Sequence, residues 1–179
     1  MRKLRPFVLG ACCAVLLFAH AAARAAAQDL SEVSRLHRTG NHADALAMAD
    51  SALAANPKDA QMRFLKGVIL AESRRSAEAI AVFQGLTEDF PELPEPYNNL
   101  AALHAGQGDY ERARVALEQA LRSNPGYATA HENLGDVHAM LASRAYARAS
   151  ALDPSNTRAS IKLALARELF AAQRAGDGR

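Results

Sequence analysis

Apolar residues recur at steps of three and four along most of this chain. In the segment 43–55, for example, Ala45, Leu46, Ala49 and Leu53 follow that spacing. Such spacing places side chains on one face of an α-helix. Prolines, which cannot continue a helix interior, separate several of these segments. The pattern predicts an all-α fold built from short amphipathic helices.

The helical segments repeat with a fixed period. Proline recurs at positions 57, 91 and 125, and alanine recurs at 45, 79 and 113 with the same even spacing. Gly40-Asn41 and Gly108-Asp109 precede the second helix of a repeat, as a tight turn between two helices requires. This period of 34 residues is typical of helix–turn–helix repeats, in which one unit cannot bury its apolar face alone.

The repeated blocks GNHADALAMADSALAANP, GDYERARVALEQALRSNP and, more loosely, SRRSAEAIAVFQGLTEDFP resemble the tetratricopeptide repeat (TPR) family over about residues 28–154. The resemblance implies a right-handed superhelical stack of helix–turn–helix hairpins with a C-terminal capping helix. We expect a repeat domain over 28–174 and a disordered tail at 175–179. Its parts are repeats at about 28–58, 59–92 and 93–126, a shortened fourth repeat at 127–155 and a capping helix at 156–173.

The fourth repeat is irregular, because the proline after Pro125 is Pro154, whereas the regular period would place it at position 159. The missing residues are those of the turn, and one apolar stripe continues through the place where it should be. We therefore predict a single long helix over 128–152. The alternative is a tight break near Ala142-Ser143. In the helix that follows, Ile161, Leu165 and Leu169 make an apolar face, opposite polar residues such as Lys162.

The N-terminal segment 1–27 has the anatomy of a secretory signal peptide: basic residues, an apolar run over 7–18 and small residues before Gln28. A retained membrane anchor and a lipidated Cys12 are the alternatives. Cys12 and Cys13 both lie in this segment, so a cleaved chain contains no cysteine. Cleavage removes four of the 21 basic residues and leaves 17 against 19 acidic ones, a balance that disfavours nucleic-acid binding.

No catalytic, cofactor or metal-binding motif is evident. The sequence contains neither a Gly-x-Ser-x-Gly elbow nor a glycine-rich phosphate loop. His104 and His138 occupy the same repeat position, His131 stands where Tyr97 stands one repeat earlier, and His37 and His42 flank a surface turn. Equivalent helices of successive repeats lie about 10 Å apart, whereas zinc ligands lie about 2 Å from the metal. We therefore expect no enzyme activity, no cofactor and no metal.

The resemblance also implies a binding site, because the first helices of successive TPR repeats line a concave groove that holds a peptide or helix. Asn99 and Asn133 are one period apart, and in related repeats such asparagines bond the main chain of a ligand; alternatively they only tie neighbouring helices together. Paired lysines that would grip a carboxylate are lacking, and an acidic groove favours a basic or neutral segment. The candidate groove residues are Gln61, Phe64, Val68, Glu72, Asn98, Asn99, Glu132, Asn133 and Asp136.

These observations predict a non-catalytic protein–protein interaction module of the bacterial cell envelope, exported to the periplasm. One alternative is an accessory subunit of an envelope assembly or secretion machine, tethered to the membrane by its N-terminal segment. Self-association through the C-terminal helices is another, should Leu163 or Phe170 remain exposed.

Overall fold

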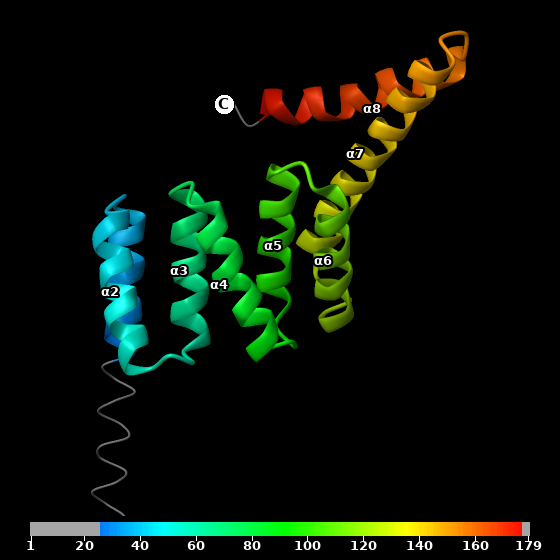
Figure 1. The fold of residues 1–179 in the computed structure, drawn as a ribbon. Helices are drawn as coiled ribbons and strands as arrows, with labels where there is room; N and C mark the ends of the chain where they lie inside the picture. Colours follow the sequence, from blue (N-terminus) through cyan, green and yellow to red (C-terminus); the bar gives the residue numbers. More distant parts are fainter. Residues whose placement is uncertain (1–25, 177–179) are drawn as a thin grey trace, which may run out of the picture. The chain divides into compact units, whose positions relative to one another are not determined.

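The computed structural model describes residues 26–176, with side chains up to residue 169, and this part of the chain consists of helices joined by short turns, without strands (Figure 1). The first described helix covers 26–38. The others are α2 (His42–Ala55), α3 (Ala60–Glu72), α4 (Ser76–Asp89), α5 (Pro94–Gly106), α6 (Tyr110–Ser123), α7 (Ala128–Leu152) and α8 (Thr157–Gly176). The all-α prediction is confirmed. None of the described helices is both long and apolar enough to cross a membrane.

Polar residues cap several of these helices at the places where the sequence interrupts the apolar pattern. The Asp59 side chain accepts a hydrogen bond from the Met62 backbone N–H at the start of α3, and Asp109 does the same for Arg112 at the start of α6. Asn156 Oδ1 accepts a bond from the Ala159 N–H at 3.0 Å, at the start of α8. Each bond satisfies a donor that has no partner within its helix.

The turns inside the first three repeats share one backbone geometry. Gly40, Arg74 and Gly108, which occupy equivalent positions in successive repeats, have positive φ angles of 79°, 60° and 76°. In the first turn, Asn41 N–H bonds Leu36 C=O at 2.9 Å and Gly40 N–H bonds His37 C=O at 2.9 Å, and the same pair of bonds closes the other two turns. This is the Schellman motif, which normally uses glycine at the left-handed residue. Repeat two uses an arginine there instead.

The chain divides into two compact units, an N-terminal unit up to Val82 and a C-terminal unit from Phe83 onward. In the N-terminal unit, the helix over 26–38, α2, α3 and the first half of α4 bury a core of mixed small and large side chains. Lys66 Nζ of α3 lies 2.5 Å from the Asp50 carboxylate of α2 and links the two helices at the surface. The fully buried members of this core include Val33, Ala45, Ala49, Met62, Ile69, Leu70 and Ala79.

In the C-terminal unit, α5, α6 and the first half of α7 enclose a second core. Alanines dominate it, and the small side chains let the helices approach closely enough to pack around Leu117, which is fully buried. Partly buried side chains such as Tyr97, Tyr127 and Leu141 surround this core. Its buried members are Ala101, Ala113, Leu117, Ala120, Ala130 and Val137.

The fourth repeat is one continuous helix, α7, of 25 residues, which confirms the prediction for 128–152 and excludes a break near Ala142-Ser143. Without the turn residues, no glycine or aspartate stands where the chain would reverse. The second half of α7 therefore runs on past the end of α6, and α8 packs against it (Figure 1). The Arg144 guanidinium of α7 lies 4.3 Å from the centre of the ring of Tyr110, the first residue of α6.

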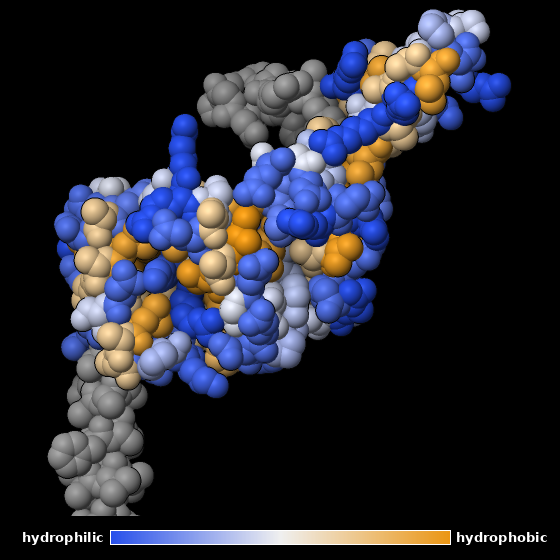
Figure 2. Space-filling view, viewed as in Figure 1, coloured by the Kyte–Doolittle hydropathy of each residue, from blue (hydrophilic) through white to orange (hydrophobic). Residues whose placement is uncertain are grey.

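The last helix differs from the predicted cap. Ala159 is buried, but Ile161, Leu165 and Leu169 are 62%, 60% and 56% exposed. The apolar face on which we based the cap is therefore turned mostly to solvent, because α8 rests on the long α7 instead of on a complete hairpin. Apolar surface gathers over the far part of α7 and the start of α8 (Figure 2). The helix continues to Gly176, beyond the predicted end, and the rest of the predicted tail lies outside the described residues.

Candidate functional site

Two candidate groove residues meet between equivalent helices of successive repeats. Asn98 lies in the middle of α5 and Asn133 in the first half of α7. Asn133 Nδ2 donates a hydrogen bond of 2.8 Å to Asn98 Oδ1, and both side chains are half-buried. An amide carries one acceptor oxygen and two N–H donors. The bond therefore ties α5 to α7 and still leaves the Asn98 N–H groups and the Asn133 oxygen with hydrogen-bonding capacity toward a ligand.

The other candidates of this unit surround that pair. Asn99 Nδ2 donates a 2.9 Å hydrogen bond to the Glu95 C=O one turn earlier in α5. The Asn99 amide therefore bonds within its own helix. Glu132 is exposed at the surface of α7, and Asp136 lies one turn further along, half-buried. The α5–α7 face thus combines the Asn98–Asn133 amide pair with two carboxylates.

The remaining candidates lie on α3, in the N-terminal unit. Gln61 is exposed, while Phe64 and Val68 are half-buried. Glu72, the last residue of α3, is hydrogen-bonded to His37: its Oε2 lies 2.7 Å from the His37 Nε2. The structure therefore presents the candidates as one set in each unit.

Sequence reasoning missed a cleft of about 410 Å³ between α5 and α6. Its lining includes His104, which is 8% exposed, and Nδ1 of that ring is buried without a hydrogen-bond partner among the residues that the structure describes. Val115, an apolar residue that lies outside the buried stripe of α6, is 49% exposed at its edge. This apolar residue outside the buried stripe is the sequence feature that could have indicated the cleft. The lining residues are Tyr97, Leu100, His104, Glu111, Arg112, Arg114, Val115, Ala116 and Gln119.

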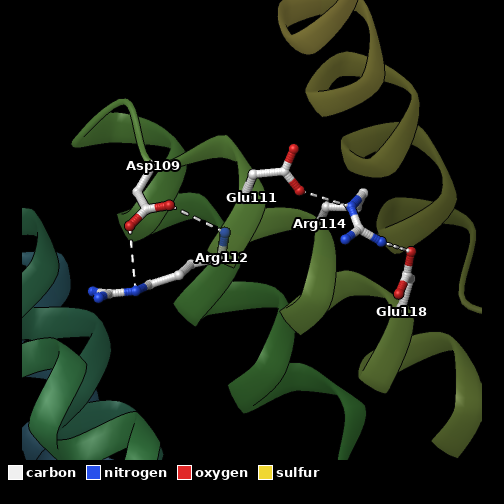
Figure 3. Close-up of polar contacts among 5 residues, drawn as sticks. All are labelled: Asp109, Glu111, Arg112, Arg114 and Glu118. Atoms are coloured by element: carbon white, nitrogen blue, oxygen red, sulfur yellow. Dashed lines mark hydrogen bonds and ion pairs between the residues drawn. The ribbon is translucent and has the colours of Figure 1, made fainter.

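The charged residues beside this cleft hold each other in place (Figure 3). Arg114 Nε lies 3.1 Å from Glu111, and its Nη1 lies 2.5 Å from Glu118. Hydrogen bonds to Glu111 and Glu118 raise the pKa of the Arg114 guanidinium. Arg112 Nε lies 3.3 Å from Asp109, the residue that caps α6. Because its arginines are paired and His104 Nδ1 is sealed from solvent, the cleft offers mainly apolar contact.

The structure also brings together three side chains that lie at non-equivalent positions of the repeat. His37, His42 and Glu72 each place one potential metal-ligand atom within 4.8 Å of the others. Equivalent positions on successive helices lie about 10 Å apart. These residues occupy non-equivalent positions at the ends of three helices, where the hairpin turns of two repeats meet.

Stacked helix–turn–helix hairpins with a fixed period, tight turns and alanine-rich contacts define a repeat protein of the helical type. The tetratricopeptide repeat family model matches residues 30–94 and 98–141, which is more than half of the chain. The chain belongs to the tetratricopeptide repeat family, and the family inferred from the sequence is confirmed. Proteins of this fold typically act as non-catalytic interaction modules.

Solved structures agree with this assignment. The chain resembles a crystal structure of the MamA protein (20% identity, TM-score 0.61, covering 80% of this chain and 81% of that one). It also resembles a thermophilic TPR protein of Thermus thermophilus (22% identity, TM-score 0.59, covering 81% and 82%). A third is the first TPR of Spaghetti (RPAP3) bound to an HSP90 peptide (15% identity, TM-score 0.61, covering 65% and 93%). No curated protein sequence matches significantly. Identities this low show the fold alone.

Proposed function

We propose that this protein is a non-catalytic scaffold that binds an extended peptide or a helix of a partner protein on the α5–α7 face. The observation that carries the proposal is the Asn98–Asn133 amide pair, half-buried between two equivalent helices. An amide pair held at a helix–helix seam is preorganised, because its geometry is fixed before a ligand arrives. The similar domain of Spaghetti is bound to an HSP90 peptide, so a domain of this fold can hold a peptide.

The charge of the face indicates the kind of partner. Neither α5 nor α7 contains a lysine, and α7 presents Glu132 and Asp136 next to the amide pair. A C-terminal carboxylate on the ligand would be repelled by these groups. A neutral or basic segment fits better, with specificity arising from charge complementarity and affinity from a few apolar anchors.

The experiment is affinity capture with the tagged protein from a bacterial envelope extract, followed by mass spectrometry. The test variants are Glu132→Lys, which reverses an exposed charge, and Asn98→Ala, which removes the amide pair. Glu88→Lys, an exposed acid at the end of α4, is the matched control. We expect one partner that is retained by the control and lost from both test variants. A partner retained by all three would place binding elsewhere, for example in the α5–α6 cleft.

Export and tethering form a separate part of the proposal, because residues 1–25 lie outside the described structure. We infer a periplasmic protein from the signal-peptide pattern, with a membrane-tethered accessory subunit as the alternative. The mass of the protein that accumulates in the envelope distinguishes them. A chain that begins at Gln28 supports cleavage, whereas a full-length chain or one lipidated at Cys12 supports the tethered form.

A second candidate function is self-association through α8. Ile161, Leu165 and Leu169 form a stripe at four-residue steps that is more than half exposed along its length. Apolar stripes of this kind are typical of helix–helix interfaces. Light scattering at increasing concentration tests it: a dimer that Leu165→Glu dissociates supports the interface, and a strict monomer contradicts it.

A further inference from the structure

Three helix ends meet in the N-terminal unit and bring together side chains with the chemistry of metal ligands. His37 lies in the last turn of the helix over 26–38, His42 is the first residue of α2, and Glu72 is the last residue of α3. His37 Nε2 lies 2.7 Å from Glu72 Oε2, and the two imidazole rings are 5.6 Å apart between centres. One ligand atom from each of the three residues lies within 4.8 Å of the other two.

These distances are close to those of an occupied site. A tetrahedral zinc ion bound at about 2.0–2.1 Å holds its ligand atoms roughly 3.3 Å from one another. The widest separation of 4.8 Å therefore has to close by about 1.5 Å, which side-chain rotations achieve. Two imidazoles and one carboxylate suit zinc and related transition metals, and three protein ligands leave a coordination position for water.

The backbone already fixes the positions of the three residues. The His37 C=O accepts a bond from Gly40 N–H, and the His42 N–H donates to the Gly40 C=O, both at 2.9 Å. Ser73, next to Glu72, donates its N–H to Ile69 C=O at 3.0 Å. The Ser73 hydroxyl also lies 3.1 Å from His42 Nδ1. A hydroxyl on one ring nitrogen orients the ring and leaves His42 Nε2 as the nitrogen available to a metal.

The charge around the cluster is compatible with a divalent cation. Neutral imidazoles with one carboxylate carry one negative charge, and two helix C-termini at the cluster add partial negative charge against one N-terminus. Of the arginines close to these residues in the sequence, Arg35 and Arg75 are paired with Glu32 and Glu78 at 2.6 and 2.7 Å. Arg38 and Arg74 also follow His37 and Glu72 along the chain, and they add positive charge.

We propose that His37, His42 and Glu72 form a binding site for a divalent transition-metal ion, with zinc as its occupant. The ligands come from the first helix of repeat one, its second helix and the first helix of repeat two. The ion joins these three helices at one end of the N-terminal unit, where the structure otherwise has a hydrogen bond between His37 and Glu72. This role is independent of partner binding on the α5–α7 face.

The test is a titration of the purified protein, in the form in which it accumulates, with zinc ions monitored by calorimetry. Cys12→Ser and Cys13→Ser are present in every sample, so that no thiolate competes for the metal. We compare this background with Glu72→Gln, which keeps a hydrogen-bond acceptor for His37, and with His42→Ala. His138→Ala, a change at a histidine of α7 far along the chain from the cluster, is the control.

We expect one zinc ion per chain, and a loss of affinity of at least about tenfold in both ligand variants, because even the loss of a residue that only hydrogen-bonds a metal ligand costs about 10–100-fold. The control should bind as tightly as the background. Because His42→Ala also loses its bond to Ser73, the background protein provides a second readout. Long-range ¹H–¹⁵N spectra should show zinc-induced shifts at the His37 and His42 rings and none at His138. Absence of one-to-one binding, or binding that Glu72→Gln leaves unchanged, overturns the proposal.

Discussion

Replacing Arg74 with glycine should stabilise the protein. Arg74 has φ of 60° in the turn between α3 and α4, where the equivalent residues of the neighbouring repeats are Gly40 and Gly108. A left-handed backbone costs a residue with a Cβ about 1–2 kcal/mol. Glycine removes that cost but gains freedom in the unfolded chain, which offsets about 0.4–1 kcal/mol. The expected net gain in the free energy of unfolding is about 0.5–1 kcal/mol.

Arg74→Ala is the matched control for the lost side chain. The arginine side chain is exposed, and it has no hydrogen bond or ion pair with any residue that the structure describes. Alanine removes it but keeps the strained backbone, so we expect a change within about 0.5 kcal/mol. Urea denaturation followed by far-ultraviolet circular dichroism measures both variants, with equal m-values as the condition for comparing them.

Gly40→Ala is the reciprocal change. A Cβ built on Gly40 meets nothing within 4 Å, so the substitution adds backbone strain without a collision. We expect the free energy of unfolding to fall by about 0.5–1 kcal/mol, because the cost of the left-handed backbone outweighs the freedom that the unfolded chain loses. An Arg74→Gly protein no more stable than Arg74→Ala, together with a harmless Gly40→Ala, would refute the reasoning from backbone conformation.

Three further predictions concern the C-terminal unit. Leu117→Ala should cost about 2–5 kcal/mol of unfolding free energy by chemical denaturation, because it leaves a cavity at a fully buried position; a loss below about 1 kcal/mol would contradict the packing described. Ala142→Pro should cost at least about 3 kcal/mol in the same assay, because it breaks α7 in its interior; a tolerated proline would favour a turn there. Burial, and secondarily the charge of Glu95, raise the pKa of the Tyr127 phenol above its usual value of 10.0. The protonated Tyr127 phenol therefore contributes its full stability below about pH 10, and this contribution is lost as the pH rises above that value. Tyr127→Phe should therefore unfold at higher pH than the unmodified protein, with tyrosinate absorbance as the measurement. Equal alkaline midpoints would contradict this.

Local sequence signals predicted most of the elements. Pro94 stands at the start of α5, Asp59 and Asp109 cap α3 and α6, and Gly40 and Gly108 form left-handed turns, each because of a property of the residue itself. The long α7 was predictable for the same reason. Deletion of a turn removes the residues that stop a helix, and the remaining ones continue its apolar stripe.

The family resemblance predicted which residues belong to the candidate site, but it did not predict which of their side chains contact each other. It left open whether Asn99 and Asn133 bind a ligand or only tie neighbouring helices together, whereas in the structure the partner of Asn133 is Asn98. The hydrogen bond between them depends on the separation and rotation of α5 and α7, which follow from the packing of alanines such as Ala101 and Ala130. The α5–α6 cleft around His104 likewise depends on packing and has no linear motif.

The sequence by itself determined the family, the period, the turns and the absence of a stop signal in α7, because these depend on residues close together in the chain. Only the tertiary structure decided which distant side chains meet. His37 and Glu72 are 35 residues apart, and their contact arises where two helices end side by side. The exposure of Ile161, Leu165 and Leu169 was decided in the same way. A periodic pattern defines an apolar face, but whether that face is buried depends on the surface against which the helix packs.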